Sequence, residues 1–255
     1  MRSAGLPGIL GAALALLLLS SGVVAQASEF AVAPDRVFLS SGNATGEITV
    51  LNQTAQALTV SVAGYAWSET KSGRQQLSAS DEIVAFPAIM TLAPLEERTI
   101  RVGLTAAAGP IEKTFRVIVT ELASPQIVAR GRSFAVHMLA AFSVPVFLTP
   151  EAGKAAYDIA DPSVSHSTFS FVVANTGNVH ILPQKAQVDA VDGAGRVIWT
   201  KVVSGWYVLA HSERSFTAAL PRSVCGSVRE LRVHITGENL DAKRAFTNFA
   251  RTCQP

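Results

Sequence analysis

Side chains able to do chemistry are sparse in this chain, and they do not form a catalytic set. The five histidines never fall at a ligand spacing such as i, i+2 or i, i+4; they are His137, His166, His180, His211 and His234. The paired carboxylates at 81–82 and 96–97 lie in turn-like stretches, where acidic side chains are solvated. The sequence contains no GxSxG, HExxH, GxxxxGK or GxGxxG motif. We therefore predict a binding protein that is not an enzyme, uses no cofactor and holds no metal.

The N-terminal stretch predicts export. Arg2 supplies a short positive region, residues 9–19 form an apolar run, and residues 25–27 (AQA) fit a small-residue cleavage site, with 23–25 (VVA) as a close alternative. The apolar run is shorter than the roughly 20 residues that a membrane span needs. We therefore expect a cleaved signal peptide over 1–27, not a membrane anchor. No later segment is apolar enough to cross a bilayer, so we expect a soluble product without stable membrane insertion.

Cysteine chemistry is the next candidate. The chain has two cysteines, Cys225 and Cys253, and an even pair in an exported protein first suggests a disulfide. The disulfide would close a loop of about 28 residues and would add roughly 3 kcal/mol of stability by the chain-entropy estimate. Two reduced thiols with a redox or metal role are the alternative, but the pair lacks a CxxC spacing and a nearby pair of histidines.

Composition and charge narrow the class of protein. The formal net charge is +2 over 255 residues, which argues against a nucleic-acid binder, because such proteins usually carry a clear basic excess. Gly, Pro, Thr, Val and Ser recur throughout, and no long segment has the 3.6-residue period of a helix. We therefore predict an all-β protein.

Alternating apolar residues predict two groups of strands. In the first part of the chain we expect strands at 30–39, 46–52, 58–67, 83–86, 88–92, 98–104, 114–121 and 134–150, with a hairpin loop at 69–80. After an irregular linker at 151–167, further strands are expected at 169–174, 185–192, 197–203, 207–209, 215–220, 230–236 and 246–252. Short strands at this spacing are typical of immunoglobulin-like sandwiches. We therefore predict two such domains, over 28–152 and 153–255.

The segment 134–150 (FAVHMLAAFSVPVFLTP) is the longest apolar strand expected. Every second residue from 134 to 144 is apolar, whereas the intervening positions are smaller or more mixed. One face of such a strand must be core, and we expect the even-numbered face to be offered to a partner protein. Its residues are Phe134, Val136, Met138, Ala140 and Phe142.

Five motifs, in the right order, carry a resemblance to a known family. They are residues 34–38 (PDRVF), 86–102, 115–122, 142–147 (FSVPVF) and 175–180 (NTGNVH). Together they resemble the periplasmic chaperones of the chaperone–usher pilus pathway, and the ending FSVPVF is similar to the donor strand of the archaic branch. The resemblance covers essentially the whole chain after residue 27.

The resemblance implies a fold, a mechanism and partners. Members of the family have two immunoglobulin-like domains arranged at an angle around a cleft. They lend the long strand to pilus subunits that lack their own last strand, and they deliver these subunits to an outer-membrane usher. By this resemblance the even-numbered face of 134–142 is the donor, and the protein is periplasmic.

One departure from the family concerns the anchor for the subunit's C-terminal carboxylate. Better-studied members pair an N-terminal Arg with a Lys near the end of the donor strand, and the resemblance assigns the first role to Arg36. Pro145 stands where the Lys is expected. Arg116 is the first choice for the second cation, because it should lie on a strand beside the long one, and Arg101 is the second choice. An Arg suits this role because it forms charge-assisted hydrogen bonds with a carboxylate.

Two further expectations concern association and the rival class. A long apolar edge strand invites aggregation, so the free protein should hide it by self-association or by covering it with another segment. The alternative function is a structural or adhesive secreted β-sandwich, such as a pilin or adhesin. The position of the long strand in mid-chain, between two domains, favours the chaperone.

Overall fold

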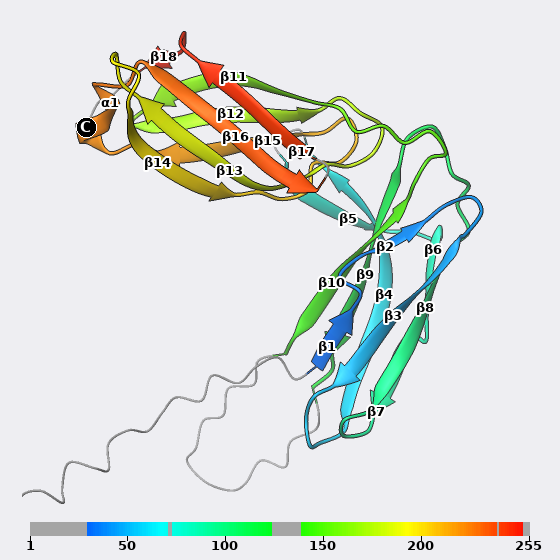
Figure 1. Cartoon of the computed structure of the whole chain (residues 1–255). Helices are drawn as coiled ribbons and strands as arrows, with labels where there is room; N and C mark the ends of the chain where they lie inside the picture. Colours follow the sequence, from blue (N-terminus) through cyan, green and yellow to red (C-terminus); the bar gives the residue numbers. More distant parts are fainter. Residues whose placement is uncertain (1–29, 71–72, 124–138, 239, 252–255) are drawn as a thin grey trace, which may run out of the picture.

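A computed structural model describes residues 30–70, 73–123, 139–238 and 240–251. These residues form two β-sandwiches, one after the other in the chain and set at an angle to each other (Figure 1). The described helical structure is one short segment, α1 (Arg222–Cys225), in the second sandwich. The prediction of an all-β chain with two tandem immunoglobulin-like domains is therefore confirmed. The signal peptide predicted over 1–27 lies outside the described residues.

The first sandwich packs a four-stranded sheet against a six-stranded one. The smaller sheet has the order β1–β3–β8–β6, with β1 (Phe30–Ala33), β3 (Thr45–Asn52), β8 (Glu97–Leu104) and β6 (Ile83–Phe86). The larger sheet has the order β2–β10–β9–β4–β5, with β2 (Val37–Leu39), β10 (Ala141–Leu148), β9 (Lys113–Glu121), β4 (Leu58–Glu69) and β5 (Gln75–Ala79). A further strand, β7 (Ile89–Leu92), pairs with β4. Alternate residues of both sheets point inward and form one apolar core.

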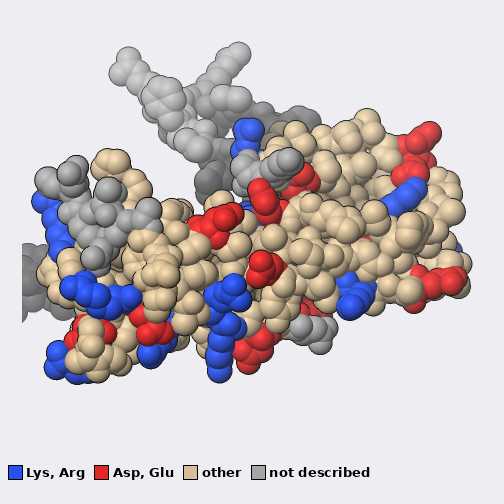
Figure 2. Space-filling view, turned by 90° about the horizontal axis from the view of Figure 1, so that it is seen from above, with Lys and Arg blue, Asp and Glu red and all other residues tan. Residues whose placement is uncertain are grey.

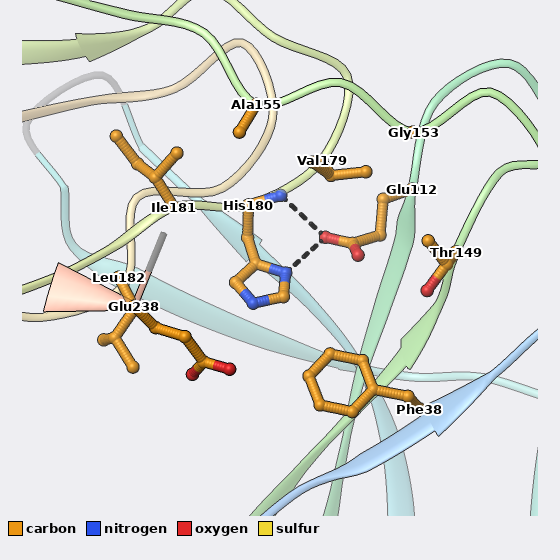
Figure 3. Close-up of a pocket in the computed structure, with 10 residues that line it drawn as sticks. All are labelled: Phe38, Glu112, Thr149, Gly153, Ala155, Val179, His180, Ile181, Leu182 and Glu238. Atoms are coloured by element: carbon orange, nitrogen blue, oxygen red, sulfur yellow. Dashed lines mark hydrogen bonds and ion pairs between the residues drawn. The ribbon is translucent and has the colours of Figure 1, made fainter. Parts of the chain in front are cut away.

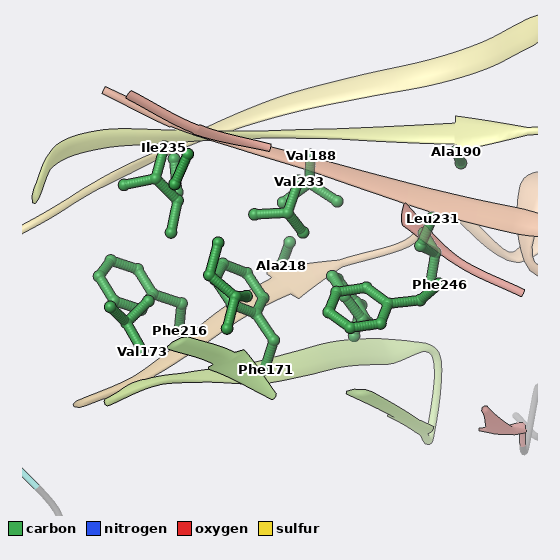
Figure 4. Packing of buried hydrophobic residues seen from close by; sticks show 14 of the residues in the cluster. Phe171, Val173, Val188, Ala190, Phe216, Ala218, Leu231, Val233, Ile235 and Phe246 are labelled. Carbon is green, nitrogen blue, oxygen red and sulfur yellow. The ribbon is translucent and has the colours of Figure 1, made fainter. Parts of the chain in front are cut away.

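The second sandwich packs two four-stranded sheets. The first consists of β15 (Glu213–Ala219), β12 (Thr168–Asn175), β11 (Tyr157–Ser165) and β18 (Ala250–Arg251), in that order. The second consists of β14 (Val197–Ser204), β13 (Leu182–Val191), β16 (Glu230–Glu238) and β17 (Leu240–Phe246). Figure 4 shows the core between them, where Phe171 and Phe216 from one sheet face Val233 and Ile235 from the other.

The prediction of an irregular linker at 151–167 is wrong over most of this range, because β11 (Tyr157–Ser165) lies there and pairs with β12. A β-bulge between Ala160 and Ser163 explains the error. Ile159 and Val164 are both buried although they are five residues apart, since the bulge shifts the inward parity by one. A strict period of two therefore could not identify this strand.

Charged side chains are spread over the surface. On the face that Figure 2 shows, basic and acidic residues are interspersed across both halves of the molecule, with large uncharged areas between them. The described part of the chain has no helix with the length and hydrophobicity of a membrane span.

Candidate functional site in the cleft between the sandwiches

A buried ion pair joins the two sandwiches at the end of β4. Glu69 is the last residue of β4, and its side chain is fully buried. Arg214 on β15 donates from Nη2 to Glu69 Oε1 at 2.7 Å, and the backbone N–H of Leu209 donates to Glu69 Oε2 at 3.1 Å. Burial raises the pKa of the Glu69 carboxyl, while the hydrogen bond from Leu209 and the charge of Arg214 oppose this shift. The contact fixes the β4–β5 hairpin to the second sandwich.

An aromatic cluster fills the centre of the junction. Trp67 from β4, Phe147 from β10 and Tyr207 from the second sandwich are buried against one another. His180 stacks on Phe147, with ring centroids 3.8 Å apart. The Nδ1 atom of His180 lies 2.7 Å from a carboxylate oxygen of Glu112, which also accepts the backbone N–H of His180 (Figure 3). These contacts pack aromatic side chains of both sandwiches against one another at the junction.

Arg116 lies under this cluster and is 2% exposed. Its guanidinium carbon is 3.7 Å from the centroid of the Trp67 ring, and Nη1 donates to the carbonyl oxygen of Ser143 at 3.3 Å. The Nε and Nη2 atoms of Arg116 are buried and have no hydrogen-bond partner within the described structure. Burial lowers the pKa of Arg116 to about 10, opposed by the nearby Tyr207 and Glu69. The structure thus holds a cation with unused hydrogen-bonding capacity.

Arg36 lies just before β2, at the entrance to the cleft, and its side chain is 21% exposed. It donates from Nη1 to Glu238 of the second sandwich and, at 3.3 Å, from Nη2 to its neighbour Asp35. The hydrogen bond to Asp35 is the largest cause of a raised pKa of Arg36, and the contact with Glu238 acts in the same direction. The charges of both Arg36 and Arg116 oppose the rise that burial causes in the pKa of Tyr207. Both cations therefore lie within electrostatic reach of Tyr207, and the guanidinium carbon of Arg116 is 5.7 Å from its ring centroid.

The third candidate, Arg101, is not brought to this cleft. It lies on β8 of the other sheet, its side chain is 82% exposed, and it approaches Glu47 at 3.9 Å. Arg36 and Arg116 thus both lie at the junction between the sandwiches, whereas Arg101 lies apart from it.

The predicted long strand is described only from residue 139. Phe134, Val136 and Met138 lie outside the described residues, whereas β10 contains Phe142 and is preceded by Ala140. Along the described part of β10 the even-numbered face, which was expected to be offered to a partner, points toward the core of the first sandwich, so that expectation is wrong for this part of the strand. Val144, Val146 and Leu148 are buried there, while Ala140 and Phe142 pack at its margin. Phe142 makes an edge-to-face contact with Phe30, with centroids 4.9 Å apart.

One edge of β10 is largely open. The strand pairs with β9 along its whole described length, but it pairs with β2 only over Val146–Leu148. Residues 141–145 therefore have no strand beside them on the β2 side within the described structure. Pro145 lies directly opposite Arg116 in the register with β9. The expectation that Arg116 lies on a strand beside the long one is thus met, at the level of Pro145.

The predicted disulfide lies partly outside the described residues. Cys225 is fully buried in the core of the second sandwich, at the end of α1, whereas Cys253 is not described. The pairing stays a prediction. Within the described ranges, no group of three or more His, Cys, Asp or Glu side chains is placed to hold a metal ion.

Sequence reasoning missed several residues of the cleft. Glu238 is 202 positions from Arg36, and Arg214 is 145 positions from Glu69, so no local pattern connects them. His180 was visible within the NTGNVH motif, but its stacking on Phe147 depends on how the two sandwiches meet.

The burial of Arg116 leads to a stability prediction. We expect Arg116→Met to raise the free energy of unfolding by about 1–3 kcal/mol, since the substitution removes buried unpaired donors and a desolvated charge. Because the pKa of Arg116 is lowered only to about 10, the folded state bears the full cost at neutral pH, and this cost falls only as the pH rises above that value. Urea unfolding curves at pH 7 measure the change.

The matched control is Arg101→Met, at an exposed strand position. We expect it to change stability by less than about 0.5 kcal/mol. A loss of stability in Arg116→Met would show that the guanidinium contributes more through Trp67 than its burial costs.

Comparisons with known proteins agree with this architecture. A family described as pili and flagellar-assembly chaperone, PapD N-terminal domain, matches residues 29–154. No curated protein sequence matches the chain significantly.

Several solved structures share the fold over most of the chain. A chain of the CsuC–CsuE chaperone–tip subunit complex, from the archaic chaperone–usher Csu pili of Acinetobacter baumannii, aligns with a TM-score of 0.55 and 13% identity, covering 88% of this chain and 99% of that one. A chain of the SafA pilin–SafB chaperone complex of Salmonella enterica aligns with a TM-score of 0.57 and 13% identity, covering 88% of this chain and 98% of that one. The CupB2 chaperone of Pseudomonas aeruginosa aligns with a TM-score of 0.54 and 12% identity, covering 85% of this chain and 99% of that one. At these identities the likeness is one of fold.

Proposed function

We propose that the whole chain is a periplasmic chaperone that folds pilus subunits, since residues 29–154 match the family described as pili and flagellar-assembly chaperone, PapD N-terminal domain. It binds each subunit by lending it a strand and delivers it to an outer-membrane usher. We place the N-terminal domain over 28–152 and the C-terminal domain over 153–255, after a signal peptide cleaved near Ala27. The likeness to the Csu complex and the sequence FSVPVF of β10 support the archaic branch.

The observation that carries this proposal is the open edge of β10. Among the described residues no strand pairs with 141–145 on the side away from β9, so an incoming strand can hydrogen-bond there, although Pro145 has no N–H and the carbonyl oxygen of Ser143 already accepts from Arg116. Alternate side chains of an added strand point to the same face. We assign the donor positions to Phe134, Val136, Met138, Ala140 and Phe142.

The cleft beside β10 supplies the second half of the site. The charges of Arg36 and Arg116 both act to lower the pKa of Tyr207, and Arg116 lies opposite Pro145 in the register of β9 with β10. We propose that these two arginines bind the C-terminal carboxylate of the subunit, so that Arg116 replaces a cation on the donor strand itself. The two free donors of Arg116 support this role, because a carboxylate would satisfy them. Trp206, which is 46% exposed, lies near this site, with its ring centroid 5.9 Å from the guanidinium carbon of Arg116.

Co-expression with a pilus subunit from the same genome tests the proposal. We expect a one-to-one complex in the periplasm, and in that complex slower amide exchange over 141–144 than in the free protein, Pro145 having no amide proton. Strand β5 is the internal control, since it is the opposite edge of the same sheet and all its residues are exposed. Protection of β5 in place of β10 would overturn the donor assignment, and the absence of any complex would overturn the function.

A further inference from the structure

Arg36 already binds a carboxylate from within the chain. Glu238, the last residue of β16, reaches across the cleft from the second sandwich and accepts a hydrogen bond from Nη1 of Arg36. The contacts of Asp35 with the same guanidinium are longer, at 3.3 and 3.4 Å. The position of Glu238 therefore shows where a carboxylate binds to this arginine.

A small apolar pocket begins at the same glutamate. Glu238, Phe38, His180 and Leu182 line a cavity of about 240 Å³ between the sandwiches (Figure 3). Arg36 lies just before β2 and Phe38 lies within it, and the Glu238 that binds Arg36 lines the pocket together with Phe38. Phe38 is 50% exposed although it lies beside Phe147 and His180. A carboxylate site and an apolar pocket thus share one wall.

We propose that Glu238 holds Arg36 in the place of the subunit's C-terminal carboxylate, and that binding exchanges one carboxylate for the other. An apolar side chain next to the incoming carboxylate then enters the pocket lined by Phe38, His180 and Leu182. The inference rests on the proposed function, since it takes the ligand to be a peptide C-terminus. Glu238 would act as an internal competitor that favours ligands able to fill the pocket as well as bind Arg36.

Glu238 is suited to such an exchange. Its side chain is 51% exposed, and ion pairs with this exposure contribute little net stability. The two sandwiches are also joined by Glu69 with Arg214 and by Glu112 with His180. Release of Glu238 therefore leaves the rest of the junction intact.

Glu238→Gln tests the exchange, because it keeps the shape of the side chain and removes its charge. The probes are two acetylated hexapeptides of identical sequence ending in Leu, one with a free carboxylate and one amidated. We expect the variant to bind the free-carboxylate peptide about two- to fivefold more tightly than the natural protein does, as removal of a half-exposed competing pair predicts. Affinity for the amidated peptide should stay the same. Fluorescence of Trp67 and Trp206 near Arg116 reports binding.

Two matched variants separate the parts of the proposal. Asp35→Asn removes the more distant carboxylate and leaves Glu238 in place, so we expect a smaller gain. Ala155→Leu fills the pocket from its exposed rim, and we expect it to weaken the Leu-ending peptide more than a Gly-ending one. An equal gain for both termini in Glu238→Gln, or no binding of the carboxylate peptide, would overturn the exchange.

The co-expressed subunit complex is measured beside the peptides. If the complex forms normally but Glu238→Gln changes the affinities for the carboxylate and amidated peptides equally, the exchange alone is overturned. If the natural protein forms no complex with the subunit, the proposed function is overturned.

Discussion

Arg214→Ala is expected to lower the free energy of unfolding by about 3–5 kcal/mol, the typical effect of removing one partner of a buried ion pair. The Glu69 side chain is fully buried, and Arg214 is its only ion-pair partner within the described structure. Arg214 also donates to the carbonyl oxygens of Gly73 at 2.8 Å and Tyr207 at 3.1 Å. The substitution therefore leaves a buried carboxylate without its cation and frees the β4–β5 hairpin from the second sandwich.

The pH dependence of this loss identifies its cause. Burial raises the pKa of Glu69 in the folded state, so the folded protein retains a proton there over a range above the normal carboxyl pKa. Stability linked to this group is present at low pH and is lost as the pH rises through the raised pKa. Without Arg214 that pKa rises further. We therefore expect the defect of Arg214→Ala to become smaller on acidification, measured by urea unfolding between pH 7 and pH 5.

An exposed pair provides the control. Arg196 contacts Asp192 at 2.8 Å, but the arginine side chain is 77% exposed. We expect Arg196→Ala to cost less than about 1 kcal/mol. Equal losses in Arg196→Ala and Arg214→Ala, or a loss in Arg214→Ala that does not change with pH, would contradict the role given to the buried pair.

The alternating residues of the sequence predicted most strands because burial follows the same period. In β12 every second residue from 169 to 175 is buried, and the sequence predicts a strand at 169–174. β5 was predicted to be part of a loop, since all five of its residues are exposed and no apolar face marks it. Residues 207–209 were predicted to be a strand, but only Val208 makes an isolated bridge, to Ile181. This triplet is apolar for another reason, because Tyr207 and Leu209 pack into the junction between the sandwiches.

The site was less predictable than the fold. Arg116 could be proposed from sequence because strand order follows from the immunoglobulin-like pattern, and β9 does pair with β10. Its environment could not, because Trp67 and Tyr207 reach it from separate sandwiches. The partner of Arg36 was equally hidden, since the position of Glu238 depends on the angle between the domains. Contacts of this kind are set by the relative placement of two domains, which a local sequence pattern does not encode.

The donor strand should give the largest functional effect. We expect Met138→Asp and Phe142→Asp each to abolish the complex with a pilus subunit, because under the proposed donor role each would place an unpaired carboxylate in an apolar contact with the subunit. The cost of burying an unpaired charge is several kcal/mol or more, enough to outweigh the main-chain hydrogen bonds of an added strand. Co-purification of the subunit from periplasmic extracts measures the effect.

The two substitutions separate binding from folding. Phe142 packs on Phe30 at the margin of the first core, so Phe142→Asp should also lower the melting temperature of the free protein. Met138 lies outside the described residues, and we expect its substitution to leave the melting temperature unchanged if it serves the subunit alone. Leu77→Asp is the matched control, because Leu77 is 41% exposed on the opposite edge strand of the same sheet. A complex that survives Met138→Asp, or one that Leu77→Asp also destroys, would show that subunits do not bind along the β10 edge.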